Sequence, residues 1–223
     1  VTSANDKEAL ERLAGRRLAQ VRVLPNGVDS TYFCPGDAPK ATAEVVFSGK
    51  LSYHANVTAA LHLVEAVMPR VWAKRPDARV VLAGKDPASE LVRLGQADPR
   101  VAVTGTVADL RPYLRRATVA AALVPYGAGI QNKVLEAMAC GTAVVGSPQA
   151  AAALMVTPGE EMLVVAEAEA QARALLQVIE DDILRAQLAK AGRNYVEAHH
   201  NWNSIAADIE GIYRVGDGRN RRE

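Results

Sequence analysis

Residues 125–148, PYGAGIQNKVLEAMACGTAVVGSP, organise the rest of the chain. Four apolar residues of this stretch fall on one side of a helix, namely Val134, Leu135, Met138 and Ala139. Gly141 follows them at a position typical of a helix C-cap. The stretch therefore predicts a loop, a helix that opens near Asn132, and a buried strand that ends at Gly146.

This predicted helix also carries two charged residues that suggest chemistry. The free N–H groups of its first turn favour a negative group, and the glycines beside it let the backbone approach a ligand closely. Glu136 lies one turn into an apolar run, where its carboxylate is either solvated or bonded to two vicinal sugar hydroxyls. Lys133 in the first turn opposes the helix dipole, a local conflict expected at functional sites. We expect a site for phosphate and sugar hydroxyls.

Outward from this stretch, apolar strands alternate with helices. The predicted strands are 45–48, 79–83, 101–104, 119–124, the strand that ends at Gly146 and a weaker one over 162–165. The predicted helices are 56–74 with Asn56 as N-cap, one near 90–94, then 109–117, 168–179, 182–199 and 201–213. Strands that are apolar along their whole length imply a parallel sheet covered on both faces. The fold class is doubly wound α/β, with its ligand beyond the strand C-termini.

The chain begins without an initiator methionine, at a stretch that resembles the end of a strand, Val1–Ser3. A short helix over 6–13 and a short strand over 21–24 are predicted next, and 34–42 has the composition of a linker. We therefore expect a piece of a longer protein. Its predicted parts are 1–40, a domain remnant with a linker; 41–200, a Rossmann-like domain; and 201–223, a helix and tail.

The composition excludes several classes of protein. Of 223 residues, 49% are hydrophobic and 23% are charged, with a net charge of +1, which is ordinary for a soluble globular protein and gives no indication of nucleic-acid binding. No apolar run reaches about 18 residues and no secretory signal opens the chain, so we expect the cytoplasm. Cys34 and Cys140 lie far apart, outside metal-ligand spacing, which predicts reduced thiols.

Two common nucleotide motifs are absent from the sequence. Ser48-Gly49-Lys50 lacks the earlier glycine and the following hydroxyl residue of a P-loop, and no GxGxxG follows a strand. Lys50 nevertheless lies at the C-terminal end of a predicted strand. There it is either a phosphate-binding point charge or an ordinary surface lysine.

Four stretches together resemble the C-terminal half of a GT-B glycosyltransferase of the retaining group usually called family 4. They occur in the order of that family and are VLPNGVD (23–29), FSGK (47–50), VTGTV (103–107) and LEAMACGTAVV (135–145). Residues 129–133, GIQNK, further resemble a bacterial subgroup associated with exopolysaccharide and protein-sorting loci. The resemblance covers nearly the whole chain.

The resemblance implies two Rossmann-like domains with the active site between them, metal-independent catalysis with retention, and a UDP- or GDP-sugar donor bound by this half. By position, Gly49 and Lys50 would contact the diphosphate, and Glu136 would bind the ribose hydroxyls. Thr106 and Val107 would line the base pocket through their backbone.

Two departures from the family concern the sugar and the phosphate. Ala128 stands where the family has a sugar-binding glutamate, so sugar contacts are expected from Gly129, Asn132 or Lys133. Lys50 stands for the usual arginine, and Asn56 lies near the position of a later lysine. Lys133 is therefore expected to supply the missing charge, and Lys50 and Lys133 are the predicted catalytic residues.

The expected function is transfer of a hexose from the nucleotide sugar to a glycan or lipid-linked acceptor in exopolysaccharide or cell-surface glycan synthesis. The acceptor, and any peripheral contact with the inner face of the membrane, would belong to the missing N-terminal domain. This chain alone is expected to bind nucleotide without transferring sugar. The alternatives are a UDP-sugar epimerase of the same fold and a non-catalytic domain that has lost activity.

Overall fold

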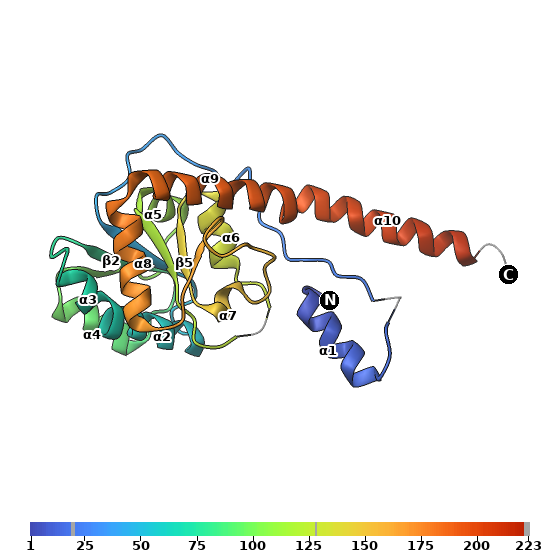
Figure 1. The fold of residues 1–223 in the computed structure, drawn as a ribbon, viewed down its shortest axis with the longest axis horizontal. Helices are drawn as coiled ribbons and strands as arrows, with labels where there is room; N and C mark the ends of the chain where they lie inside the picture. The colour runs from blue at the N-terminus through green and yellow to red at the C-terminus, as the bar shows by residue number, and fades with distance from the viewer. Residues whose placement is uncertain (19–20, 128, 221–223) are drawn as a thin grey trace.

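The computed structural model describes residues 1–18, 21–127 and 129–220, with side chains described as far as Tyr213. Its centre is a six-stranded sheet in the order β3-β2-β1-β4-β5-β6, with all neighbouring strands parallel (Figure 1). The strands are β1 Glu44–Ser48, β2 Arg79–Ala83, β3 Val101–Val103, β4 Val119–Ala122, β5 Val144–Gly146 and β6 Leu163–Val164. The predicted doubly wound α/β fold is confirmed.

The strand order reverses between β1 and β4, which forms the topological switch point of the sheet. All residues of both strands are buried, because each strand has helices on either side of it. Val46 of β1 lies opposite Val81 on one neighbour and Ala120 on the other. A crevice at the carboxyl ends of β1 and β4 is the expected ligand position in such a sheet.

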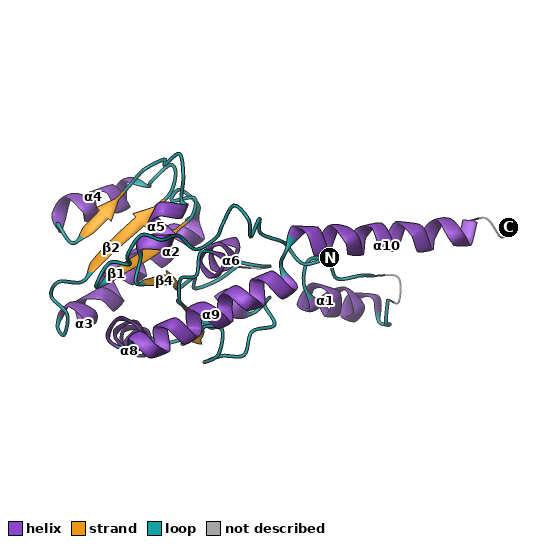
Figure 2. Ribbon diagram, turned by 90° about the horizontal axis from the view of Figure 1, so that it is seen from above, coloured by secondary structure: helices purple, strands orange, loops and turns teal. Residues whose placement is uncertain are grey.

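Helices cover both faces of the sheet (Figure 2). The helical segments of the α/β body are α2 His54–Leu61, η1 His62–Val67, α3 Met68–Trp72, α4 Ser89–Ala97, α5 Arg111–Arg116, α6 Asn132–Ala139, α7 Pro148–Ala151, α8 Ala168–Glu180 and α9 Asp182–His199. Helix α8 packs against η1 and α3, and α6 packs against α5 and α9. Of these, α7 was not expected from the sequence.

The helix predicted over 56–74 is wrong in two details. It begins at His54 with Tyr53 as N-cap, and a π-helical segment interrupts it over η1. Pro69, near the start of α3, has no N–H to continue the α-helical hydrogen bonding, which explains the break. Asn56 is not the N-cap, because its side-chain amide donates to the carbonyl of Lys50 instead.

The N-terminal strands predicted over 1–3 and 21–24 do not form. The N–H of Leu24 donates to the carbonyl of Val1 over 2.8 Å, but the pairing does not extend into a ladder among the described residues. Helix α1, Ala4–Ala14, forms as expected, and Ser3 caps it through the N–H of Asp6. This helix and α10, Trp202–Asn220, lie at the same end of the molecule, and α10 projects from the α/β body (Figure 1).

The end of α6 follows the sequence prediction closely. Gly141 has a left-handed φ of 68°, and its N–H donates to the carbonyl of Met138. The next N–H, of Thr142, donates to Ala137 over 3.0 Å. This paired capping satisfies the last carbonyls of the helix and turns the chain directly toward β5, which begins at Val144.

Candidate functional site

The candidate site begins where β1 and β2 end, at the carboxyl edge of the sheet. The N–H of Gly49 donates to the carbonyl of Ala83 over 3.1 Å, which continues the sheet one residue past β1. A Cβ added to Gly84 would overlap the carbonyl oxygen of Gly49 and lie 2.8 Å from its carbonyl carbon. The two glycines therefore let the strand ends approach closely. Lys50 follows Gly49, and its side chain is exposed.

Asn56 joins the β1–α2 turn to α6. Its Nδ2 donates to the carbonyl of Lys50 over 2.9 Å, and its Oδ1 accepts from Nζ of Lys133. The side chain lies directly over Gly49, since a Cβ there would be 2.9 Å from Nδ2. These contacts bring together the predicted residues Gly49, Lys50 and Lys133 around an amide that the sequence did not assign to the site.

The ammonium of Lys133 lies in a mostly buried position. Its Nζ is 4.7 Å from the ring centroid of Phe47 in β1, close enough for a cation–π contact. Burial lowers the pKa of Lys133 from 10.5 to about 8, and the opposing effect comes from Glu136. The lysine therefore keeps a proton near neutral pH with little solvent around it, which strengthens its attraction for an anion.

Glu136 follows Lys133 by three residues and is also shielded from solvent. Burial raises the pKa of its carboxyl group from 4.5 to about 7, while Lys133 lowers it. Glu136 is half-buried, and its binding to sugar hydroxyls stays a prediction. Because the two groups titrate close to each other and to neutrality, a bound ligand can change the protonation of both.

Thr106 and Val107, predicted at the base pocket, lie in the loop after β3. The hydroxyl of Thr104 accepts the N–H of Gly84 over 3.3 Å, which ties this loop to the end of β2. The Thr106 side chain is exposed and that of Val107 is half-buried. Both residues are at the same edge of the sheet as Gly49, and their contact with a base stays a prediction.

The predicted sugar contacts lie in the loop before α6 and at its first turn. Gly129 has a left-handed φ of 78°, and Asn132 is exposed, with Oδ1 at 3.4 Å from Nδ2 of Asn26. Gln131, the N-cap of α6, makes no capping hydrogen bond through its side chain. Ala128, where the resemblance expects a glutamate, lies outside the described residues. The sugar-binding roles stay predictions.

One contact between α2 and the loop before α6 could not be predicted from the sequence. Nδ1 of His54, at the start of α2, is 2.9 Å from the hydroxyl of Tyr126, and the two rings stack with centroids 5.4 Å apart. The two residues are 72 positions apart in the sequence. Sequence periodicity carries no signal for such a pair.

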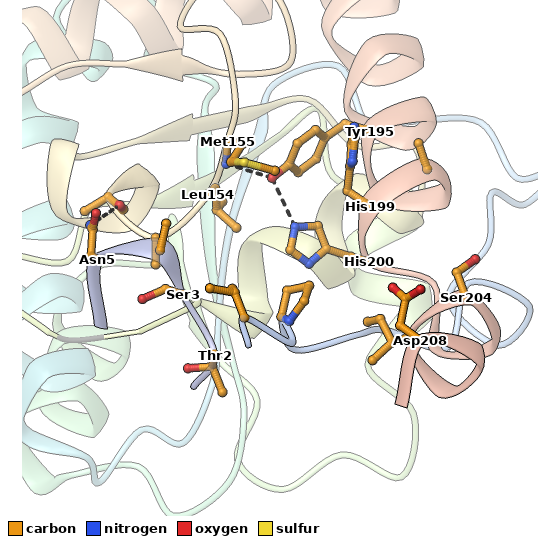
Figure 3. Close-up of a pocket in the computed structure, with 17 residues that line it drawn as sticks. Thr2, Ser3, Asn5, Leu154, Met155, Tyr195, His199, His200, Ser204 and Asp208 are labelled. Carbon is orange, nitrogen blue, oxygen red and sulfur yellow. Dashed lines mark hydrogen bonds between the residues drawn. The ribbon is translucent and has the colours of Figure 1, made fainter. Parts of the chain in front are cut away.

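A pocket of about 530 Å³ lies elsewhere, between the N-terminal segment and the junction of α9 with α10 (Figure 3). Inside it the Tyr195 hydroxyl accepts the N–H of Met155 and lies 3.0 Å from Nε2 of His200. Among the described residues, its lining includes none of those predicted for the site. The other ring nitrogen of His200 lies 2.7 Å from the carbonyl oxygen of Asn26, so Tyr195 and His200 connect three segments of the chain at this pocket.

The described residues include neither a candidate metal-binding cluster nor a membrane-spanning helix. In that part of the chain, no three or more His, Cys, Asp or Glu residues group closely enough to hold a metal ion. Cys34 and Cys140 are free thiols, as expected. None of the described helices combines the length and apolar character that a membrane crossing requires. Metal independence stays a prediction.

Comparisons with known proteins agree with this architecture. Residues 42–181 match the family model described as glycosyl transferases group 1. The chain is 28% identical over 204 residues to phosphatidyl-myo-inositol mannosyltransferase of Mycolicibacterium smegmatis, covering 87% of the chain and 52% of that relative. It is 27% identical to GDP-mannose-dependent monoacylated alpha-(1-6)-phosphatidylinositol monomannoside mannosyltransferase of Corynebacterium glutamicum, covering 85% of the chain and 55% of the relative.

Among solved structures, sucrose-phosphate synthase from Thermosynechococcus elongatus superposes with a TM-score of 0.79 at 26% identity. The match covers 98% of this chain and 58% of that one. The chain therefore spans about half the length of the curated relatives it matches.

Proposed function

The chain belongs to the glycosyl transferases group 1 family, and on that premise we propose that it forms the donor-binding half of a glycosyltransferase. The observation that carries the proposal is the pairing of Lys133 with Glu136 on α6. The ammonium of Lys133 lies beside Phe47 near the carboxyl end of β1, Glu136 follows it by three residues on the same helix, and both side chains are largely shielded from solvent. A nucleoside diphosphate offers a matching anion and a pair of ribose hydroxyls.

The diphosphate is assigned to Lys133, Lys50 and the first-turn N–H groups of α6. Lys133 supplies the main charge, because it is partly buried whereas Lys50 is exposed. As the bond to the sugar breaks, negative charge grows on the leaving diphosphate, and a preorganised ammonium stabilises it. Binding also favours the protonated lysine, since the ligand charge opposes the effect of burial.

The ribose and the sugar are assigned to the neighbouring residues. Glu136 accepts hydrogen bonds from the ribose hydroxyls, and the backbone of Thr106 and Val107 lines the base. Gly129 and Asn132 contact the donor sugar. These assignments follow the resemblance of the motifs and agree with the positions of the residues along one sheet edge.

The wider reaction is also part of the proposal. The mannosyltransferase names of the two relatives support transfer of a hexose over epimerisation, and their inositol-lipid names support a lipid-linked acceptor. Retention of configuration, a role in exopolysaccharide or cell-surface glycan synthesis, membership of the exopolysaccharide and sorting subgroup, and a cytoplasmic location remain predictions.

The first test is a thermal-shift and calorimetric comparison of UDP, GDP and ADP. At about 100 Kd the matching ligand stabilises the fold by roughly 2.7 kcal/mol, which is on the order of 5–10 °C in Tm. Glu136→Ala is expected to remove most of this shift, because the ribose loses its acceptor. Glu65→Ala, at an exposed carboxylate, is the control. A shift that survives in Glu136→Ala would remove Glu136 from the site.

The pH dependence of binding gives a second prediction. Glu136 becomes ionised as pH rises through about 7, and Lys133 loses its proton as pH rises through about 8. Affinity for the nucleoside diphosphate should therefore rise through about 7 and fall above about 8. The terminal phosphate also ionises near pH 6, so Glu136→Gln, which cannot titrate, is the control. If affinity rises with pH in the same way in Glu136→Gln and in the wild type, Glu136 does not bind the ribose.

A further inference from the structure

We propose that the Asn56 side chain is the positioning residue for Lys133, holding its ammonium at the diphosphate position. The inference rests on the proposed function and concerns the same site. Asn56 itself need not touch the ligand. Its effect is to place a flexible lysine from α6 over the end of β1.

The two hydrogen bonds of the amide define its orientation. Nδ2 donates to the carbonyl of Lys50 over 2.9 Å, which directs Oδ1 toward Lys133. An amide nitrogen cannot accept and an amide oxygen cannot donate, so both contacts fit only this orientation. A lysine side chain loses rotamer entropy when it is held in one place, and a prearranged acceptor lowers that loss on ligand binding.

Helix capping does not explain why Asn56 is buried in the first turn of α2. It lies two residues after the start of α2, and Tyr53 is the N-cap. The residue is 8% exposed, and asparagine is unfavourable inside helices. The two contacts to Lys50 and Lys133 therefore account for a buried polar residue that capping does not explain.

A neutral acceptor suits this role better than a charged one. The groups around the Lys133 ammonium are the Phe47 ring from β1, the Asn56 amide from α2 and Glu136 on α6 itself. Of these three, Glu136 alone is ionisable. Asn56 therefore holds the ammonium without neutralising it and leaves its charge available for the ligand. An aspartate at position 56 would pair with Lys133 and repel a diphosphate.

The test measures binding of UDP, GDP and inorganic diphosphate to the 223-residue chain by calorimetry between pH 6 and 9.5. Asn56→Ala is expected to weaken nucleotide affinity about tenfold. It should also shift the falling limb of the affinity–pH profile, where affinity declines as Lys133 loses its proton, to lower pH, because the charged lysine loses an acceptor. Asn56→Asp is nearly isosteric. It should weaken affinity more strongly at pH 7 and move the falling limb to higher pH by about one unit, since a carboxylate favours the ammonium.

Asn194→Ala, at an exposed position in α9, controls for the loss of an asparagine, and Tm confirms that each variant is folded. A wild-type chain that binds none of the three ligands would overturn the proposed function itself. A wild-type chain that binds, with falling limbs at the same pH in Asn56→Ala, Asn56→Asp and wild type, would overturn the positioning role alone. Opposite shifts of the limb in the two variants support it, because a merely structural residue would lower affinity equally at every pH.

Discussion

Lys133→Met is expected to lower the affinity for the matching nucleoside diphosphate by about 100-fold, equivalent to roughly 2.7 kcal/mol. The substitution removes the one cation that the structure holds in a largely buried position at this end of β1, among the residues it describes. Charge-assisted hydrogen bonds to phosphate are strong in such surroundings, whereas the exposed Lys50 is screened by solvent. Isothermal titration at pH 7 measures the loss.

The same substitution should stabilise the ligand-free chain. The pKa of Lys133 falls from 10.5 to about 8 on folding, so the cost of burying its charge is fully present below about pH 8 and disappears toward pH 10.5. Methionine has a similar length and no charge, and a gain of about 1–2 kcal/mol at pH 7 is expected. The gain should shrink as pH rises from 7 to 10.

Lys190→Met, at an exposed lysine of α9, is the matched control and should change neither property much. Nucleotide affinity that survives in Lys133→Met would show that the diphosphate binds elsewhere. Lower stability of Lys133→Met at pH 7 would show instead that the ammonium contributes more through its contacts with Asn56 and Phe47 than its burial costs.

Gly84→Ala is expected to lower the free energy of unfolding by about 3–5 kcal/mol, or Tm by on the order of 10 °C. The added Cβ would overlap the carbonyl oxygen of Gly49, and backbone cannot move aside as a flexible side chain can. The ends of β1 and β2 must separate to accommodate it. Because Gly49 lies beneath Asn56, nucleotide affinity should fall as well. Thermal and urea unfolding, followed by titration of the folded variant, measure both effects.

Gly211→Ala is the control for the loss of a glycine. Gly211 lies in α10, and a Cβ there meets no other atom within 4 Å. Alanine is a better helix former than glycine by about 1 kcal/mol, so this variant should be as stable as the wild type or slightly more so. Equal stability of Gly84→Ala and wild type would contradict the close approach of the two strand ends.

Much of the fold could be predicted because it depends on local pattern. Strands β1 and β2 are runs of apolar residues, bounded by turn residues, and each was placed to within one residue. The end of α6 was predicted from Gly141, since a left-handed residue after a helix favours glycine. The N-terminal strands were wrong for the converse reason. A strand needs partners, and the composition of 1–3 and 21–24 does not say whether partners are present.

Within the site, the sequence by itself determined which residue types lie at the carboxyl edge of the sheet, because parallel strands place their following loops together. Only the tertiary structure decided what those residues do to one another. The Lys133–Asn56 bond joins residues 77 positions apart, and the pKa values of Lys133 and Glu136 move toward neutrality because several elements bury them. Desolvation and hydrogen bonding are properties of that assembled environment, and residue spacing along the chain does not encode them.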